Sequence, residues 1–390
     1  MQTAGAKRAV TNSNLALVRG FLLPMNHTDA EILAAYEQAG TKIGGARLLV
    51  MDERGYRRRL NKLLEADQFN VPDNFSVSRI TELQRDDGKP SIRWVRKERD
   101  KEQQEEAFKA LLEGFKAEMP KASAVPEPRT ECHHQLLNLY VLTDYHLGMK
   151  SWHEETGADW DTSIAEDLLV RWFTMAIDQS PKSEVGLLAI LGDFLHWDGM
   201  DAVTPTSRHL LDADSRFSKI VRVAIKVIRQ IVNLLLDKHF HVYMKAMEGN
   251  HDPASSIWLR ELFAFFYQDE PRVTVDTSPD PYGCYEHGKT ALFFHHGHKR
   301  KMGNVDTVFA AKFREIFGRT KHSYAHMGHL HHVDVKETNL MIVEQHRTLA
   351  APDAYASRGG WMTGRDAQVI TYHKDYGYTG RVIISPEMVG

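Results

Sequence analysis

Apolar residues at helical spacing predict a small helical unit near the start of the chain. The segment Thr28-Asp29-Ala30-Glu31 matches a capping box, and apolar residues follow at helical spacing from Ile32 to a stop signal at Gly40. A second helical stretch covers residues 43–50, and a third begins near Asp52. Three short helices in succession fit a helix-turn-helix domain.

Beyond these helices, the pattern predicts a β-hairpin, an amphipathic helix and a linker. Residues 75–80 and 92–95 have strand character and flank a turn tetrad at 86–89. Residues 108–119 carry an apolar stripe at helical spacing, and prolines interrupt the pattern in the segment 120–130. The expected organisation is an N-terminal domain of residues 1–119, a linker of residues 120–130 and a second domain of residues 131–390.

From residue 135 onward, apolar strands alternate with helices. This alternation predicts an α/β domain in which helices cover a sheet. The expected strands are residues 136–142, 187–191, 242–247, 291–294 and 324–327 with short strands after 333, and the expected helices are 163–179 and 217–236.

The composition narrows the class of protein. The chain has 390 residues, of which 42% are hydrophobic and 26% charged, as in an ordinary globular protein, and its net charge of -3 indicates no partner. No apolar run approaches membrane-spanning length and no signal peptide is evident, so we expect no membrane partner. The two cysteines, Cys132 and Cys284, exclude a disulfide framework and suit a reducing compartment. We therefore expect a cytoplasmic protein.

Positive charge is concentrated around the third predicted helix. Residues 41–62 hold seven Lys or Arg against two acidic residues. In a helix-turn-helix this charge would contact DNA, which makes Arg57, Arg58 and Arg59 candidate DNA-binding residues. A solvated face of a small helical bundle explains the same pattern equally well.

Candidate chemistry lies in the last two-thirds of the chain. Of the 21 histidines, 20 follow residue 131, and histidine is the commonest metal ligand. Five motifs rich in His, Asp and Asn each follow an expected strand, and ligands in α/β folds bind where loops meet at the carboxyl ends of strands. The motifs are D-Y-H-L-G at 144–148, G-D-F-L-H at 192–196, G-N-H-D at 249–252, H-H-G-H at 295–298 and G-H-L-H-H at 328–332.

The residue types in these motifs suit divalent cations. D-x-H offers an oxygen and a nitrogen to one ion, and the carboxylate of the second motif can bridge two ions. The amide oxygen of Asn250 is an acceptable hard ligand, and His329 and His331 alternate as on a strand, so both face one side. A single histidine of this kind is more often an ordinary surface or hydrogen-bonded residue. Five motifs together leave little room for that explanation.

The order D-x-H, G-D, G-N-H-D, H-G, G-H-x-H resembles that of the calcineurin-like metallophosphoesterase superfamily over about residues 135–345. The motif at 144–148 together with G-D-x-x-H looks most like the SbcD-type DNA repair nucleases, because many phosphatases of the superfamily have Asp or Asn where His196 stands. The N-terminal extra domain is similar to that of phage- and prophage-borne phosphoesterases. The resemblance implies an α/β fold with a β-sandwich flanked by helices, preceded here by a small, mostly helical domain.

The resemblance also implies a ligand set for two divalent metal ions, with Mn2+ expected and Fe2+, Zn2+ or Mg2+ as alternatives. In the fourth motif His295 and His298 are alternatives to His296, which is preferred because the family ligand precedes a glycine. The first ion would take Asp144, His146, Asp193 and His331, and the second would take the bridging Asp193 with Asn250, His296 and His329.

The expected reaction is hydrolysis of a phosphodiester, with a metal-bridging hydroxide as the nucleophile. His251 would act as general acid and Asp252 would hold its ring, while His196 would steady the phosphate or assist the proton transfer. The basic residues Lys299, Arg300 and Lys301 would contact a phosphate backbone, unless they form a solvated loop.

A DNA nuclease is therefore the expected function, and DNA the expected partner. The alternative is a phosphatase or phosphodiesterase acting on a nucleotide or phosphoprotein. The complete ligand set argues against a third reading, a DNA-binding regulator with an idle metal site. SbcD-like nucleases carry a capping domain and a segment that binds an SMC-like ATPase after their core. Only 59 residues (390 − 331) follow His331, which argues against that partner.

Overall fold

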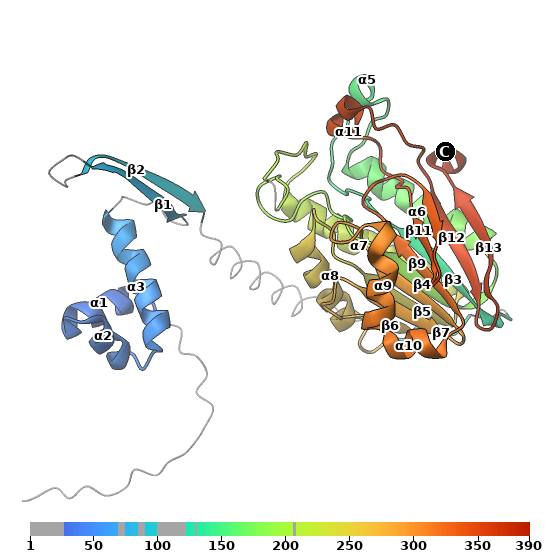
Figure 1. Cartoon of the computed structure of the whole chain (residues 1–390), viewed down its shortest axis with the longest axis horizontal. Helices are drawn as coiled ribbons and strands as arrows, with labels where there is room; N and C mark the ends of the chain where they lie inside the picture. Colours follow the sequence, from blue (N-terminus) through green and yellow to red (C-terminus); the bar gives the residue numbers. More distant parts are fainter. Residues whose placement is uncertain (1–26, 69–74, 85–89, 100–121, 129–130, 206–207) are drawn as a thin grey trace, which may run out of the picture. The chain divides into compact units, whose positions relative to one another are not determined.

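The computed structural model describes residues 27–68, 75–84, 90–99, 122–128, 131–205 and 208–390. The chain divides into two compact units, Met1–Ala110 and Leu111–Gly390 (Figure 1). The turn tetrad expected at 86–89 and the amphipathic helix expected at 108–119 lie outside the described residues.

Three helices begin the described part of the first unit. Helix α1 (Asp29–Ala39) starts with the predicted capping box, in which Thr28 and Glu31 bond each other's backbone, and it ends at Gly40 with a φ of 63°. Helices α2 (Lys42–Leu48) and α3 (Glu53–Gln68) follow. All three pack around a core that includes Ile32, Ala35, Ala46, Tyr56 and Leu60.

An antiparallel hairpin follows the three helices. It consists of β1 (Phe75–Gln84) and β2 (Pro90–Arg99), whose pairing joins Phe75 to Arg99 and Gln84 to Pro90. The structure thus contains both the three-helix arrangement and the hairpin that the sequence predicts for this unit.

The second unit contains two sheets. The larger sheet has the strand order β13-β12-β3-β4-β5-β6, in which β3 to β6 run parallel, β12 runs antiparallel to β3, and β13 runs antiparallel to β12. Its strands are β3 (His133–Leu142), β4 (Ser183–Ile190), β5 (His241–Ala246), β6 (Val273–Val275), β12 (Ala367–His373) and β13 (Gly377–Ile384).

The smaller sheet has the order β10-β11-β9-β8-β7, with a parallel centre and antiparallel edges. Its strands are β7 (Gly283–His287), β8 (Thr290–His295), β9 (His322–Met327), β10 (Asp334–Glu337) and β11 (Ile342–Gln345). One apolar core joins Leu139 and Leu187 of the larger sheet to Leu292 and Phe294 of the smaller. The two sheets therefore pack face to face as a sandwich.

Helices cover the outer faces of the sandwich (Figure 1). Phe173 stacks on Tyr140 of β3 on one side, and on the other Phe309 packs against Phe293 of β8. The helices of this unit are α5 (His153–Thr156), α6 (Thr162–Gln179), α7 (Phe217–Lys238), α8 (Pro253–Phe266), α9 (Met302–Lys312), α10 (Arg314–Arg319), α11 (Ala354–Gly359) and α12 (Pro386–Val389). The prediction of an α/β sandwich flanked by helices is confirmed.

Residues 122–128, inside the segment expected as a linker, are bound to the second unit. The amide of Ala122 donates to the carbonyl of Phe266 at 3.0 Å. The buried Arg272 donates to the carbonyls of Val125 at 3.2 Å and Pro126 at 2.7 Å. This stretch therefore belongs structurally to the sandwich. Among the described helices, none has the length and apolar character needed to cross a membrane.

We expect Gly45→Ala to destabilise the three-helix part of the first unit. A Cβ on Gly45 would lie 2.0 Å from the hydroxyl of the buried Tyr56, which donates to the carbonyl of Ile32 at 3.0 Å. Overpacking of this kind costs about 1–3 kcal/mol. Hydrogen exchange of residues 29–68 in the full-length chain measures the loss as reduced amide protection. Gly55→Ala is the matched control, because its nearest neighbour would be 3.4 Å away. Wild-type protection in Gly45→Ala would contradict the prediction.

Candidate metal centre

The five motifs follow five different strands, and their polar side chains meet at one place. Three motifs come from the larger sheet and two from the smaller, so the site depends on the two sheets packing together. Asp144, Asp193 and Asn250 follow β3, β4 and β5, whereas His296 and His329 follow β8 and β9. This is the convergence at strand ends that the sequence predicts.

The backbone is strained at these positions. Residues other than glycine rarely adopt a positive φ, which costs on the order of 1–3 kcal/mol each and persists where the surroundings enforce it. Five of the expected ligands have this conformation: Asp144 (50°), His146 (47°), Asp193 (50°), His329 (79°) and His331 (56°). Strain concentrated in one cluster points to a functional site.

Two glycines let the motif loops approach one another. A Cβ on Gly249 would lie 1.9 Å from Oδ1 of Asp193, and one on Gly328 would lie 1.9 Å from the hydroxyl of Thr143. No other residue fits at either position without moving a carboxylate or its neighbour. The glycines of G-N-H-D and G-H-x-H therefore have a steric role in closing the site.

Asp144, His146 and His331 form a first group of donors, with ligand atoms within 4.8 Å of one another. Nε2 of His331 lies 3.2 Å from Oδ1 of Asp144 and 3.4 Å from Nε2 of His146. The other oxygen of Asp144 accepts hydrogen bonds from the Thr143 hydroxyl at 2.5 Å and the His329 amide at 2.8 Å. These two hydrogen bonds fix the carboxylate so that its Oδ1, which accepts no hydrogen bond, faces the rings of His146 and His331.

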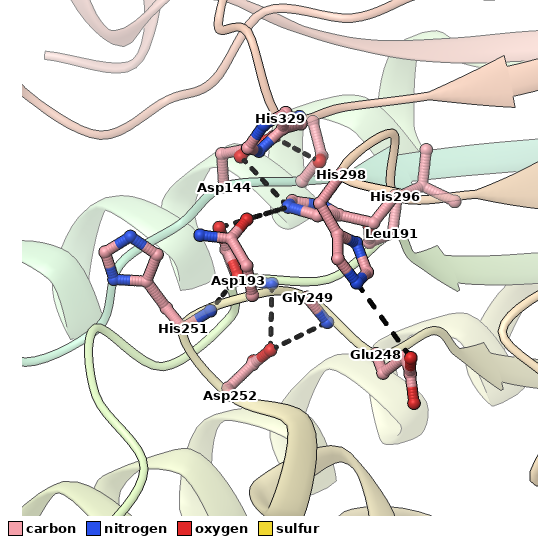
Figure 2. A network of polar contacts seen from close by, with 12 residues as sticks. Asp144, Leu191, Asp193, Glu248, Gly249, His251, Asp252, His296, His298 and His329 are labelled. Carbon is pink, nitrogen blue, oxygen red and sulfur yellow. Dashed lines mark hydrogen bonds and ion pairs between the residues drawn. The ribbon is translucent and has the colours of Figure 1, made fainter. Parts of the chain in front are cut away.

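Asp193, His296 and His329 form a second group within the same distance (Figure 2). Nδ1 of His296 donates to the carbonyl of Leu191 at 2.9 Å, so Nε2 faces the site. There it lies 3.1 Å from Oδ2 of Asp193 and 3.2 Å from Oδ1 of Asn250. A backbone partner on one ring nitrogen that leaves the other free is the usual arrangement of a metal-binding histidine.

The electrostatics of the site centre on two buried carboxylates. Burial opposes the charge of Asp144, but the rings of His331 and His296 outweigh it and hold its pKa below the usual range. Burial would likewise lower the pKa of His296, yet Asp193 and Asp144 raise it to about 10. Burial and the neighbouring His251 lower the pKa of His146 far below its usual value, and it is neutral imidazole that binds metals.

The other two histidines of the fourth motif face elsewhere. His295 donates from Nδ1 to the carbonyl of Pro281 at 2.9 Å, and its ring stacks on Tyr282 with centroids 4.4 Å apart. Nε2 of His298 lies 3.9 Å from Oε1 of Glu248, and Figure 2 shows that ring turned toward Glu248. The geometry therefore favours His296 as the ligand of this motif.

His251 and His196 lie together beside the first group. Nδ1 of His251 donates to the backbone carbonyl of His196 at 2.8 Å, and the two rings stack with centroids 5.6 Å apart. His196 is only 1% exposed, and burial together with His251 lowers its pKa to about 3. The backbone carbonyl and the stacked ring of His196 fix the orientation of His251, so the geometry favours a positioning role for His196.

The expectation that Asp252 holds the ring of His251 is wrong. Both oxygens of Asp252 are used by backbone amides: Oδ1 accepts from Asp193 at 3.0 Å and Gly249 at 3.1 Å, and Oδ2 accepts from Leu195 at 3.1 Å. Figure 2 shows this carboxylate between the two loops. Asp252 therefore joins the second and third motifs, and the carbonyl of His196 holds the ring of His251.

The basic residues expected to bind substrate or DNA are exposed or partly exposed. Lys299, Arg300 and Lys301 are exposed, and Lys299 pairs with Glu248. On α3, Arg57 pairs with Glu53 at 2.7 Å and Arg59 pairs with Asp29 at 2.7 Å, and Arg57 and Arg58 are exposed. These arginines belong to the first unit, whereas the five motifs belong to the second.

Three supporting residues escaped the sequence interpretation. Besides Thr143, the hydroxyl of Thr348 donates to the carbonyl of Asp144 at 2.6 Å. The carboxylate of Asp198 accepts from the amides of Ala254 and Ser255 at the start of α8, just after Asp252. Asp198 lies two residues after His196, and this closeness to the second motif could have indicated its role. None of the five motifs lies near Thr348 in the sequence.

The residues present fit divalent cations. They comprise two adjacent groups of carboxylate and imidazole donors, with the amide of Asn250 beside the second. Oδ1 of Asp144 is a buried acceptor without a hydrogen-bond partner, which a cation would satisfy. A third group, His146, His196 and His251, shares His146 with the first.

No protein-family model matches the chain, and no curated protein matches it significantly. Solved structures that are similar include a predicted phosphoesterase from Streptococcus pneumoniae, with 10% identity, 64% of this chain and 98% of that one covered, and a TM-score of 0.29. Vacuolar Protein Sorting 29 from Cryptosporidium parvum has 13% identity, coverages of 64% and 98%, and a TM-score of 0.30. Phosphopantetheinyl Hydrolase from Mycobacterium tuberculosis has 11% identity, coverages of 59% and 94%, and a TM-score of 0.25.

We expect Asp252→Asn to destabilise the second unit and weaken binding of Mn2+. An amide side chain offers one acceptor oxygen, so at least one of the three backbone amides loses its partner, at a cost of about 1–3 kcal/mol. Urea unfolding and titration with Mn2+ measure the two effects. Asp237→Asn, which changes an exposed residue of α7, is the control. If Asp252→Asn matched this control in both measurements, Asp252 would not hold the loops.

Proposed function

We propose that the second unit is a two-metal-dependent phosphodiesterase and that its substrate is DNA. The observation that carries the proposal is the pair of buried donor groups, Asp144–His146–His331 and Asp193–His296–His329, with His251 directly beside them. Asn250 completes the second group, and Asp193 is the residue that both ions would share. Of the common divalent cations, Mn2+ suits this mixture of carboxylate, amide and imidazole donors.

Two bound cations would orient the phosphodiester and lower the pKa of the attacking water. The chain's own residues then govern the departure of the leaving group. Since the carbonyl of His196 accepts from Nδ1 of His251, the ring has one orientation. Its imidazolium form, which carries a second proton on Nε2, would give that proton to the leaving oxygen and return to the neutral ring. His251 is half-buried, which lets it meet a substrate. His196 is a positioning residue in this scheme.

Three features support DNA as the substrate. The second motif has the histidine found in SbcD-type nucleases, which the sequence resembles. Lys299, Arg300 and Lys301 present positive charge directly after the ligand motif of β8. The first unit contains three helices, of which α3 is rich in arginine, followed by a hairpin. Three short helices with a basic third one are typical of a helix-turn-helix domain that binds DNA.

We expect Asp193→Ala and His251→Ala each to lower kcat for bis-p-nitrophenyl phosphate with Mn2+ by at least about a hundredfold. The first removes the shared ligand, and the second removes the general acid, whose contribution is typically about 10²–10⁴-fold. Steady-state kinetics measure both. His209→Ala, which removes an exposed histidine, is the control and should leave kcat unchanged. Wild-type rates in both site variants would exclude this assignment.

A second prediction concerns the first unit. We expect the double variant Arg57→Gln/Arg58→Gln to weaken binding of duplex DNA and to reduce the slope of log affinity against log salt concentration, because phosphate contacts release counterions. Turnover of the small diester should stay the same. Arg171→Gln is the matched control, since Arg171 pairs with Asp167 one helical turn away as Arg57 pairs with Glu53. An unchanged salt slope would remove the DNA-binding role of α3.

Substrate choice decides between the nuclease and its alternative. The metal-loaded protein is incubated with labelled linear and circular DNA, with mononucleotides and with a phosphopeptide. Cleavage of DNA supports the nuclease, whereas turnover of mononucleotides or the phosphopeptide alone would favour a phosphatase.

A further inference from the structure

Large apolar side chains are exposed on or next to two short helices, α5 and α11, which pack against each other (Figure 1). Tyr355 is 67% exposed and Trp361 is 56% exposed, and their ring centroids lie 5.1 Å apart. Trp152, the N-cap residue of α5, is 54% exposed, and Met362 is 91% exposed. We call these four residues the aromatic shelf. Exposed patches of this kind usually mark a binding surface.

Both segments that carry the shelf begin at the metal centre. One segment contains Asp144 and His146 and reaches Trp152 six residues after His146. The other runs from Thr348, which bonds the carbonyl of Asp144, to Tyr355. The two segments are joined where the hydroxyl of Ser151 donates to the carbonyl of Pro352 at 2.7 Å. The shelf is therefore continuous with the backbone that holds the first donor group.

The shelf is fixed in place rather than loosely attached. The hydroxyl of Ser357 donates to the carbonyl of Glu155 at 2.7 Å, and Arg358 pairs with the carboxylate of Glu155 at 2.6 Å. The ring of Trp361 lies over Gly359, where a Cβ would come within 2.9 Å of it. A ring held against a glycine has little freedom to lose when a ligand binds to its exposed part.

The size and chemistry of the shelf favour a small planar group over a protein surface. A stable protein interface uses about 20–30 residues a side, whereas the shelf offers four apolar side chains, on or next to two helices of four and six residues. Aromatic faces stack on nucleobases without regard to sequence.

We propose that the aromatic shelf stacks an unpaired base of a nucleic-acid strand whose phosphodiester lies at the metal centre. This inference rests on the proposed phosphodiesterase function and narrows its substrate to single-stranded nucleic acid or unpaired ends. In a closed duplex the bases are stacked on one another and are not offered to the shelf.

The test compares shelf variants of the full-length, Mn2+-loaded protein on three substrates. These are a single-stranded oligonucleotide, a covalently closed circular duplex, and bis-p-nitrophenyl phosphate, which carries no base. Trp361→Ala removes the ring, Trp361→Phe keeps a smaller one, and Gly359→Ala displaces the ring without removing it. Tyr376→Ala is the matched control, because Tyr376 is 73% exposed on the turn between β12 and β13.

We expect Trp361→Ala to raise KM for the single strand by about five- to a hundredfold, the range measured for loss of one stacked base. Gly359→Ala should raise it in the same direction, Trp361→Phe should restore most of the affinity, and Tyr376→Ala should change nothing. Turnover of bis-p-nitrophenyl phosphate should be unaffected by all four variants, and the closed duplex should be a poor substrate throughout.

Three results would overturn the inference. An unchanged KM for the single strand in Trp361→Ala would show that the shelf does not bind it. An equal loss on bis-p-nitrophenyl phosphate would show that Trp361 supports the fold of the metal centre. A changed oligomeric state of Trp361→Ala in sedimentation, with unchanged KM, would make the shelf an interface between copies of the chain. If the wild type hydrolysed neither diester nor oligonucleotide, the proposed function itself would fail, which is distinct from each of these results.

Discussion

The structure depends on one electrostatic constraint, the enclosure of two carboxylates, Asp144 and Asp193, where water does not reach them. Each is almost fully buried, and the charges nearby that stabilise them are the rings of His296 and His331. Burial of an uncompensated charge costs several kcal/mol, on the order of what stabilises a whole domain. The loops that carry the expected ligands also contain residues in the left-handed conformation. The packing around these loops therefore offsets both the repulsion between the two carboxylates and the backbone strain. Divalent cations bound here would neutralise both carboxylates, so the same geometry that is costly for folding suits a metal centre.

Asp252 is the interaction that makes this enclosure stable. Its carboxylate accepts from three backbone amides on two loops, so the second and third motifs cannot separate without leaving buried donors unsatisfied. Asp198 extends the same arrangement to the first turn of α8. The chain thus uses two further carboxylates, neither of them facing the donor groups, to position those that do. This division of labour explains why the motif G-N-H-D ends in an aspartate although the neighbouring His251 takes its orientation from a carbonyl.

The sequence predicted those parts of the fold that local patterns determine. The strands before the motifs appear within a few residues of their expected bounds, and α7 begins at Phe217 as expected, because long apolar runs and helical periodicity are local properties. The capping box at Thr28 is equally local. The roles of Asp252 and His196 were not predictable in this way. They depend on hydrogen bonds between residues 55 to 59 positions apart, which only the pairing of β4 with β5 brings together. The choice among His295, His296 and His298 likewise needed the third dimension, since only one of the three rings turns toward Asp193.

The reaction and the choice of substrate are encoded in different parts of the chain. The donor groups lie in short loops at strand ends, where the two sheets fix them and few residue types fit. The surface that we propose to select the substrate lies further out, around α5 and α11, which contribute little to the core between the sheets. Exposed residues there follow no periodicity, and a tryptophan at position 361 is indistinguishable in sequence from one that is buried. Sequence motifs therefore indicate the class of reaction, whereas the choice of substrate depends on side chains around the metal centre whose exposure only the fold determines.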